Sequence, residues 1–518
     1  MSFEMMAPLM FGGLVVFMLL GYPVAFSLAA NGLFFGLIGM AHGSIEPALL
    51  QALPERVLGI MANSTLLAIP FFTFMGLILE RSGMAEDLLD TIGQLFARVR
   101  GGVAYAVVFV GALLAATTGV VAASVLAMGL ISLPVMMRYG YSNRLSAGII
   151  AASGTLAQII PPSLVLIVLA DQMGASVGDF YEGALFPGLG LAAAYALWVL
   201  IVSIIKPEAA PGCPPEARTH YGWALVRRVF TTMIPPLVLI FLVLGTIFMG
   251  VATPTEGGAM GATGAIVMAM AKRKLPFSLL KQAVETTAMM TSFVMFILVG
   301  STVFSLVFRG VDGDLWVERL LIGLPGGALG FLIVVNVMIF FLAFFLDYFE
   351  IAFIMVPLLT PVAQKLGIDI VWFGVLLAVN MQTSFLHPPF GFALFYLRSV
   401  APRSVKTMDI YWGAVPFVVI QAIMVAVVVA FPGMVTGNIS AAAGAIKGSG
   451  ADELQRQLGG GASTPSKPSE DSASDLEKLI QQQGAKPGDA KPAEAPKAEE
   501  KPAEDPAAEL EKALKGQK

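Results

Sequence analysis

Two carboxylates stand far from the ends of a strongly apolar stretch of this chain. They are Asp347 and Glu350, in the segment FLDYFEIAF at residues 345–353. A carboxylate at membrane depth is costly and marks a functional site by default. We expect Asp347 to be a cation ligand or a structural anchor, although an aspartate there could instead cap a short helix. Glu350 is the weaker candidate, because it could simply face water or another subunit.

A second apolar stretch carries hydroxyl groups in place of carboxylates. The segment ATTGVVAAS, residues 116–124, combines Gly119 with two threonines and a serine. Small residues let the chain turn tightly, and the hydroxyls offer oxygen ligands. Residues 101–137 and 325–364 are each too long for one membrane helix and are interrupted by polar residues. We therefore expect two re-entrant hairpins, with tips near 116–124 and 345–353.

The remaining reactive side chains do not indicate an enzyme. The chain has three histidines and one cysteine, Cys213, and its sequence shows no cluster of histidines with carboxylates. An intramembrane enzyme would need a nucleophile with a base, or a metal cluster, at one depth. A primary pump would need a Gly-rich phosphate loop ending in Lys-Ser/Thr, and the sequence shows none. We therefore assign no catalytic residue.

The elements that must position these residues are membrane helices. Of 518 residues, 57% are hydrophobic and 13% are charged, and the mean hydropathy is +0.81. Soluble domains are nearer one quarter charged. Apolar runs recur to about residue 433, which predicts an all-α polytopic membrane protein. Besides the two hairpins, the expected spans are about 5–20, 23–40, 57–79, 145–170, 184–205, 228–250, 254–271, 286–308, 369–397 and 409–432; we expect the first to be retained rather than cleaved as a signal peptide.

The basic residues fit one orientation of these spans. With the N-terminus outside and both hairpins re-entrant, sixteen Lys and Arg residues fall on inward loops and four on outward loops. Cytoplasmic loops of membrane proteins carry such an excess. If the two hairpins were complete crossings, parts of this charge distribution would be inverted and the inward excess of Lys and Arg would be lost. The same count places residues 434–518, rich in Ala, Pro, Glu and Lys, outside the cytoplasm; we expect a disordered tether there, or else a partner-binding element.

Two of the expected spans are interrupted by adjacent prolines. SGTLAQIIPPSLVLIVLA, residues 153–170, contains Pro161 and Pro162, and NMQTSFLHPPFGFALFYLR, which begins at Asn380, contains a second Pro-Pro pair. A helix cannot run unbroken through such a pair. Pro161 and Pro388 are 227 positions apart, and the same offset relates other prolines and glycines of the chain. The sequence therefore predicts two related halves, inverted in the membrane, each with a re-entrant hairpin and a discontinuous helix.

Inverted repeats with discontinuous helices are typical of secondary transporters. A break at membrane depth is tolerated where it is buried in protein or lines a watery cavity, and its half-helix ends can then bind ions. A kink that serves packing alone would explain one break better than two matched ones. Each hairpin also follows an amphipathic stretch, 86–100 and 312–324. These could be interfacial arms that join a fixed scaffold to a moving body, or plain connectors.

The chain resembles a known family of membrane proteins. The segments NSTLLAIPFFTFMGLILERSGMAEDLLD, GALLAATTGVVAASVLAMGLISLPVMMRYGY, SGTLAQIIPPS, TPTEGGAMGA and LLAVNMQTSFLHPPFGFALFYL together look like the large membrane subunit, DctM-like, of tripartite ATP-independent periplasmic (TRAP) transporters. The resemblance covers residues 1 to about 433. It implies an elevator mechanism with sodium as the coupling ion and no other cofactor. It also implies a bacterial inner-membrane location, a small four-helix membrane subunit and a periplasmic solute-binding protein.

The resemblance also implies a set of site residues. The implied sodium ligands are Thr117, Thr118, Gly119, Ser124, Gly154, Thr155, Pro161, Asp347, Gln382, Thr383, Ser384 and Pro388. The residues expected around the substrate between them are Ser153, Gln158, Ser163, Asn380 and His387. His387 is the one histidine expected at membrane depth; it could touch the substrate or titrate, or it could be a satisfied packing residue.

The expected organisation follows from the repeat. Scaffold helices and an arm occupy 1–98 and 206–324, transport-domain halves occupy 99–205 and 325–433, and the tail is 434–518. The resemblance implies sodium-coupled import of a small carboxylate. Within the family, FLDYFEIAFIMVP and QTSFLHPPFGFALFYL look most like the branch associated with 2-oxo acids, lactate and other small carboxylates. The alternative is a stand-alone anion transporter or exchanger of similar fold. Membrane lipid surrounds the protein in either case, and we expect no nucleic-acid partner.

Overall fold

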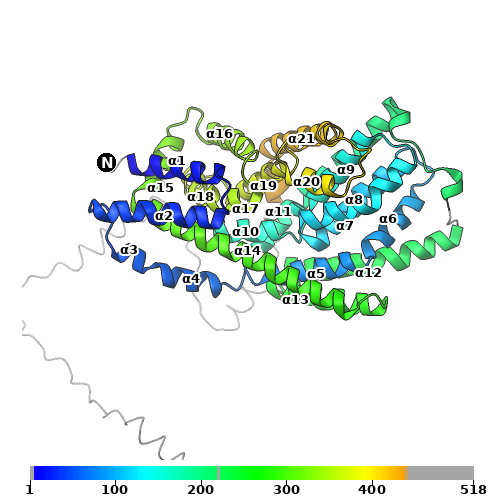
Figure 1. Ribbon diagram of the computed structural model, residues 1–518, viewed down its shortest axis with the longest axis horizontal. Coiled ribbons are helices and arrows are strands. Elements are labelled where there is room, and N and C mark those ends of the chain that lie inside the picture. Colours follow the sequence, from blue (N-terminus) through cyan, green and yellow to red (C-terminus); the bar gives the residue numbers. More distant parts are fainter. Residues whose placement is uncertain (1–4, 219–221, 438, 440–518) are drawn as a thin grey trace, which may run out of the picture. The chain divides into compact units, whose positions relative to one another are not determined.

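The structure is a computed structural model in which residues 5–218, 222–437 and 439 are described (Figure 1). Contacts divide the chain into two units, Met1–Gly448 and Ser449–Lys518, and the described residues all belong to the first. Every regular element in those residues is a helix, as the apolar runs predict. The predictions for the tail from residue 440 onward lie outside the described residues.

The helices of the first half follow the expected spans, hairpin and arm. They are α1 (Met6–Leu19), α2 (Val24–Ala41), α3 (Ala48–Gln51), α4 (Leu53–Met61), α5 (Ala68–Arg81), α6 (Met84–Leu95), α7 (Gly102–Thr118), α8 (Val121–Arg138), α9 (Asn143–Thr155), α10 (Leu164–Met173) and α11 (Val177–Ile205).

The second half repeats this order with shorter pieces in its hairpin. Its helices are α12 (Gly222–Phe248), α13 (Pro254–Ala271), α14 (Phe277–Gly310), α15 (Gly313–Ile322), α16 (Gly327–Leu342), α17 (Tyr348–Ile354), α18 (Val356–Lys365), α19 (Ile370–Met381), α20 (Phe392–Val400) and α21 (Thr407–Ala430).

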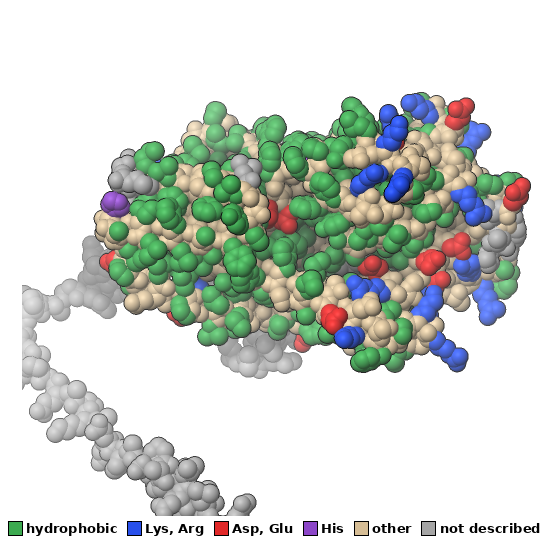
Figure 2. Space-filling model, viewed as in Figure 1, with side chains coloured by type: hydrophobic (Ala, Val, Ile, Leu, Met, Phe, Trp, Pro, Cys, Tyr) green, Lys and Arg blue, Asp and Glu red, His purple; other side chains and the backbone are tan. Residues whose placement is uncertain are grey.

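Length and composition select the helices that could cross a membrane. Among the described residues, six helices are long and apolar enough to cross a membrane: α2, α8, α11, α12, α14 and α21. Large apolar side chains on their outer faces are exposed; Phe241 of α12, for example, is 75% exposed. Figure 2 shows such side chains over much of one face of this unit. Exposed apolar surface of this extent is what a bilayer covers.

Two helix pairs that correspond in the repeat pack closely along each other. Helix α2 packs along α14, and α13 packs along α5; the repeat relates α2 to α13 and α5 to α14. A Cβ added at Gly32 of α2 would lie 3.0 Å from the Cα of Phe304 on α14. A Cβ added at Gly258 of α13 would likewise lie 3.0 Å from the Cβ of Phe71 on α5. Small residues let membrane helices approach closely, so the same device serves both pairs.

One expected span differs from the structure. The segment 57–79 is divided between the end of α4 and α5, because α4 ends at Met61 and a turn follows at Asn63. The Asn63 side-chain oxygen accepts a hydrogen bond from the backbone N–H of Thr65 at 2.9 Å. Such a local turn competes with the helix. The short α4 is therefore a separate element, with no buried residue of its own.

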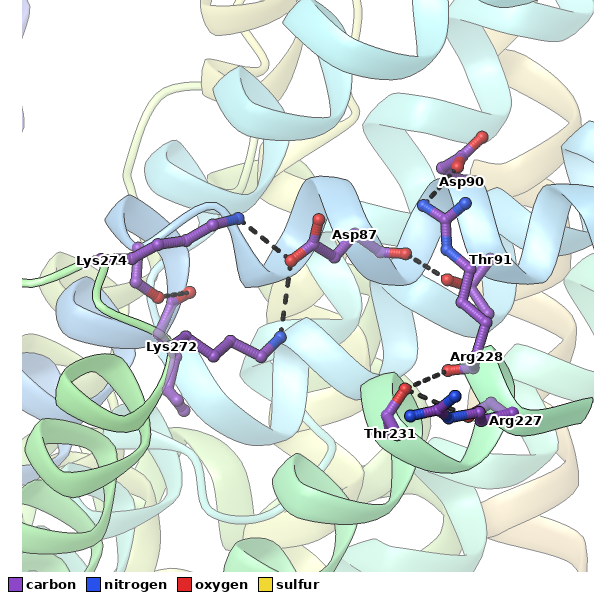
Figure 3. A network of polar contacts seen from close by, with 10 residues as sticks. Asp87, Asp90, Thr91, Arg227, Arg228, Thr231, Lys272 and Lys274 are labelled. Atoms are coloured by element: carbon purple, nitrogen blue, oxygen red, sulfur yellow. Dashed lines mark hydrogen bonds and ion pairs between the residues drawn. The ribbon is translucent and has the colours of Figure 1, made fainter. Parts of the chain in front are cut away.

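Both expected arms are helices, α6 and α15, and their ionic contacts differ. On α6, Asp87 pairs with Lys274 at 3.1 Å and Lys272 at 3.4 Å, and Asp90 pairs with Arg228 at 2.7 Å, so α6 is tied to α12 and to the turn after α13 (Figure 3). On α15, Glu318 instead pairs with Lys365 at the end of α18, at 2.6 Å.

Candidate functional site at two broken helices

The first hairpin turns within two residues. Helix α7 ends at Thr118 and α8 begins at Val121, and Gly119 between them has φ +59°. Glycine reaches this left-handed conformation without the penalty of a Cβ. A Cβ at Gly119 would also lie 3.0 Å from Cγ of Leu164, the first residue of α10. The predicted tip at 116–124 is confirmed, and it meets the broken helix.

The first broken helix has the predicted form. Helix α9 ends at Thr155, a 3₁₀ turn covers Leu156–Gln158, and the Pro161–Pro162 bond is cis. Ser163 then begins the next half-helix, because its hydroxyl accepts a hydrogen bond from the N–H of Leu166 at 3.5 Å. The same hydroxyl donates to the Gln158 carbonyl at 2.6 Å, which closes the break.

Both arms of the first hairpin pack on the end of α9. Gly111 of α7 lies against Ser153, where an added Cβ would be 2.6 Å from the serine Cβ. Gly154 lies against Val125 of α8, with a virtual Cβ 3.1 Å from its backbone nitrogen. Ser124, next to Val125, is buried. The hairpin and the broken helix therefore enclose one set of buried polar groups.

The second hairpin turns at Ala343–Asp347, near its predicted tip. Asp347 caps α17 through a complete capping box: its Oδ1 accepts from the Glu350 N–H at 2.7 Å, and Glu350 Oε2 accepts from the Asp347 N–H at 2.9 Å. The alternative interpretation of Asp347, as a helix cap, is therefore confirmed. Glu350 is its partner in that cap. A cation at Asp347 stays a prediction.

The second broken helix matches the first. Helix α19 ends at Met381, a 3₁₀ turn covers Gln382–Phe385, the Pro388–Pro389 bond is cis, and α20 follows from Phe392. The two breaks differ in exposure, since Pro161 and Pro162 are buried while Pro388 is half-buried and Pro389 exposed.

The second hairpin holds its broken helix through side chains. The Asn380 amide donates to the backbone oxygen and to the side-chain oxygen of Asn336 on α16, at 2.8 and 2.9 Å. His387 stacks on Phe344 with ring centroids 4.1 Å apart and meets Phe340 edge-on at 4.4 Å. His387 is 1% exposed. The ring therefore packs between aromatic side chains, but neither of its nitrogens has a hydrogen-bond partner in the part of the chain that the structure describes, so contact with a substrate stays a prediction.

A hydrogen bond joins the two broken helices at equivalent positions of the repeat. The Gln382 amide donates to the Thr155 hydroxyl at 3.1 Å, and these residues are 227 positions apart, the offset that relates the Pro-Pro pairs. The Thr155 hydroxyl itself donates to the Ala152 carbonyl at 2.8 Å. Thr383 Oγ1 donates to the Asn380 carbonyl at 2.7 Å. Each break is therefore hydrogen-bonded to its own helix, and the two meet at one buried point.

Packing between the halves is reciprocal. Helix α10, from the first broken helix, contacts α17, α18 and α19 of the second half. Helix α20, from the second broken helix, contacts α8 and α9 of the first half. Each hairpin thus lies between the N-terminal part of its own broken helix and the C-terminal part of the other. Six of the predicted residues, spread over both halves, gather at these two breaks: Ser153, Gly154, Thr155, Gln382, Thr383 and Ser384.

Several polar atoms at the breaks are buried without a hydrogen-bond partner. They include Ser153 Oγ, Gln158 Oε1, Gln382 Oε1, Ser384 Oγ and both ring nitrogens of His387. Buried polar groups are normally satisfied, so each such group calls for an explanation. Four oxygens and the facing half-helix ends form a neutral, oxygen-rich environment. Such an environment can bind a monovalent cation and, at helix N-termini, an anionic group.

Some predicted residues are placed differently or not at all. The side chains of Thr117 and Thr118 lie outside the described residues. The hydroxyl of Ser163 donates its hydrogen bond to the Gln158 carbonyl, within the break itself. Conversely, the sequence reading missed Asn336, which supports Asn380. Its signal was an amide within the apolar run FLIVVNVMIFF.

This architecture, two related halves that each contain a hairpin and a broken helix, defines the class of secondary-transporter permeases. The family described as tripartite ATP-independent periplasmic transporter, DctM component, matches residues 11–434. The chain belongs to this family.

Relatives and a solved structure agree. The chain is 29% identical over 425 residues to the C4-dicarboxylate TRAP transporter large permease protein DctM of Rhodobacter capsulatus, covering 78% of this chain and 93% of the relative. It is 27% identical to the isethionate TRAP transporter permease protein DctMQ of Oleidesulfovibrio alaskensis, covering 78% of this chain and 62% of that protein. The crystal structure of the Alcanivorax borkumensis YdaH transporter shares the fold, with a TM-score of 0.52 at 13% identity, covering 75% of this chain and 90% of that one.

Proposed function

We propose that this permease imports a small organic acid, a carboxylate, by sodium-coupled transport across a bacterial inner membrane. The observation that carries the proposal is the pair of buried breaks joined by the Thr155–Gln382 hydrogen bond and surrounded by unsatisfied oxygens. Oxygens without partners at membrane depth are costly unless a ligand completes them. A sodium ion at each break would do so, and the carboxylate would lie between the two ions.

The proposed movement is of an elevator type. The transport body is 99–205 with 325–433, because the hairpins, the broken helices and α11 and α21 pack on one another. The scaffold is 1–98 with 206–324, held by the α2–α14 and α13–α5 pairs. The proposal is that the transport body slides against this scaffold as one unit, so that the breaks open to each side of the membrane in turn.

The proposed orientation has the N-terminus outside. Figure 2 shows Lys and Arg side chains gathered at the end of the described unit formed by α6, α8, α12 and α13. These residues belong to loops that the charge count assigns to the cytoplasm, and an excess of positive charge on that side supports the assignment.

The proposed partners are a small four-helix membrane subunit and a periplasmic solute-binding protein. The family description itself, a tripartite periplasmic transporter, supports two further components. The proposed substrate class rests on the relatives, whose names specify a C4-dicarboxylate and isethionate. Both are small organic anions, and within this range we propose a carboxylate, with 2-oxo acids and lactate among the candidates.

Uptake by proteoliposomes tests the proposal. The permease, reconstituted with the two proposed partners, is expected to accumulate a radiolabelled carboxylate only when a sodium gradient is imposed. Uptake that persists without sodium would contradict the coupling. Uptake by the permease alone would instead support the stand-alone exchanger. A Gln382→Met variant, which removes the donor to Thr155 with little change in volume, should need about fivefold more sodium for half-maximal uptake, as expected for one lost neutral hydrogen bond.

A further inference from the structure

A polar cavity lies away from the two Pro-Pro breaks, between the proposed scaffold and the proposed transport body. Its volume is about 350 Å³, and its walls come from α4 and α14 on one side and from α10 and α18 on the other. This volume is at the small end of the range of known small-molecule sites. The cavity walls include two arginines, Arg56 and Arg309. The charge count assigns both to the outward side.

Neither arginine has a carboxylate partner among the described residues. The acidic residue in the cavity, Asp171, is already engaged: its Oδ1 accepts from the Asn63 amide at 2.6 Å and its Oδ2 from the Gln172 amide at 3.1 Å. Two cations and one anion leave the cavity positive. An arginine guanidinium presents a planar fork of donors that matches a carboxylate.

The inverted repeat shows that Arg309 differs from its counterpart. Arg81 ends α5 as Arg309 lies in the last turn of α14, and α5 corresponds to α14. Arg81 donates to the side chains of Thr286 and Gln282 on α14, at 3.1 and 3.5 Å. Arg309 donates no such side-chain bond among the described residues and lines the cavity instead. The same position therefore serves packing in one half and is available to a ligand in the other.

The cavity is connected to the first break by one helix. Asp171 and Gln172 lie at the end of α10, whose first residue, Leu164, touches the first hairpin tip. A helix of ten residues is about 15 Å long. We infer that this cavity is a waiting site, which binds the carboxylate through Arg56 and Arg309 on the outward side before it reaches the broken helices. The direction of travel rests on the proposed function; binding of the anion does not.

Thiol protection tests the inference without transport. In a Cys213→Ser background, Ser305→Cys places a thiol in the cavity wall. Its rate of reaction with a maleimide is measured in phosphatidylcholine nanodiscs, with no sodium gradient, in the presence of succinate, pyruvate or isethionate. At least one of the carboxylates, succinate or pyruvate, should slow the reaction threefold or more. Arg56→Gln and Arg309→Gln should each raise the half-protecting concentration about tenfold, the effect of one lost charged hydrogen bond.

The matched control is Arg319→Gln, an arginine of α15 that the charge count also places outside but that does not line the cavity. It should leave protection unchanged. The inference is overturned if neither carboxylate protects, if protection survives both cavity variants, or if the thiol is unreactive at Ser305→Cys and also at Thr302→Cys. The measurement is repeated in nanodiscs that contain phosphatidylglycerol, with no anion added. If only this lipid protects the thiol, the site binds a lipid headgroup and the inference is overturned too. Protection without sodium-driven uptake would remove only the proposed function.

Discussion

At the scale of single residues, the polar groups at the two breaks are neutral. The acidic pair at the second hairpin tip forms hydrogen bonds that begin a helix. Asp347 and Glu350 cap α17 for each other, while Thr155, Gln382 and Asn380 carry the contacts between elements. A carboxylate whose Oδ1 accepts a backbone N–H still has lone pairs for a cation. Capping and ion binding by Asp347 are therefore separable, and substitution can separate them.

Asp347→Asn keeps an acceptor for the Glu350 N–H, because asparagine caps helices as well as aspartate does. We expect thermal unfolding in detergent to be unchanged, while the sodium concentration for half-maximal uptake rises about tenfold, as expected for loss of a charged ligand. Asp347→Ala, the control, should lower stability by about 1 kcal/mol because the cap is lost. Normal sodium dependence in Asp347→Asn would leave the residue with its capping role alone.

At the scale of elements, close backbone approaches fix the hairpins on the broken helices. Gly154 meets Val125 of α8, and Gly111 meets Ser153. Membrane helices gain stability mainly by such contacts, since lipid supplies no hydrophobic drive between them. Ion pairs add a second kind of link. Asp87 of α6 pairs with Lys272 and Lys274 (Figure 3), and Glu318 of α15 pairs with Lys365 of α18.

Gly154→Ala should lower stability by about 1–3 kcal/mol, the usual cost of overpacking. The new methyl would collide with the Val125 side chain, so adding Val125→Ala should recover part of the loss in thermal unfolding. Gly245→Ala on α12, where nothing lies within 4 Å of a virtual Cβ, is the control and should be neutral or stabilising. Equal effects at both glycines would contradict close packing at the first break.

Asp87→Asn tests the ionic link of α6. Because Asp87 and its two lysines are 36%, 26% and 43% exposed at their side chains, the loss should not exceed about 1 kcal/mol. It should grow as salt is lowered, since screening weakens at low ionic strength. Glu285→Gln, which breaks an exposed pair within α14, should have no measurable effect. A loss in Asp87→Asn that does not depend on salt would point to packing in place of charge.

At the scale of the whole described unit, two halves of one design face each other, with scaffold pairs, hairpins and breaks all in correspondence. The predicted topology gives the two halves opposite orientations in the membrane, as in transporters with inverted repeats. The orientation of the helices can be measured by labelling loops on the two sides of the membrane, independently of transport.

His42 follows α2 and Arg403 lies between α20 and α21, and both residues are exposed. Each is replaced by cysteine, His42→Cys or Arg403→Cys, in a Cys213→Ser background. An impermeant maleimide applied to right-side-out vesicles should label His42→Cys at once and Arg403→Cys only after detergent is added. The reverse pattern would invert the proposed topology. Labelling of both from one side would contradict the predicted crossing count between them.

The sequence was sufficient for the breaks, the hairpin tips and the repeat, because Pro-Pro pairs, glycines and carboxylates act locally on the backbone. Contacts between distant segments were harder. The Thr155–Gln382 bond was available in principle from the 227-residue offset, whereas the stacking of His387 on Phe344 depends on how a hairpin folds back. The break between Met61 and Ala68 was missed because a turn within an apolar run resembles a continuous span. The Arg56–Arg309 cavity joins four separate helices and leaves no local pattern.

The bond between Thr155 and Gln382 has a consequence for the origin of the molecule. A residue at the centre of a two-fold arrangement faces its own copy, so an ancestor with identical halves would have placed the same side chain on both sides of this contact. In this contact the Gln382 amide donates and the Thr155 hydroxyl accepts, so the two equivalent positions play different parts. The two halves are thus no longer equivalent at the centre of the molecule, and we expect the two proposed sodium sites to differ in affinity.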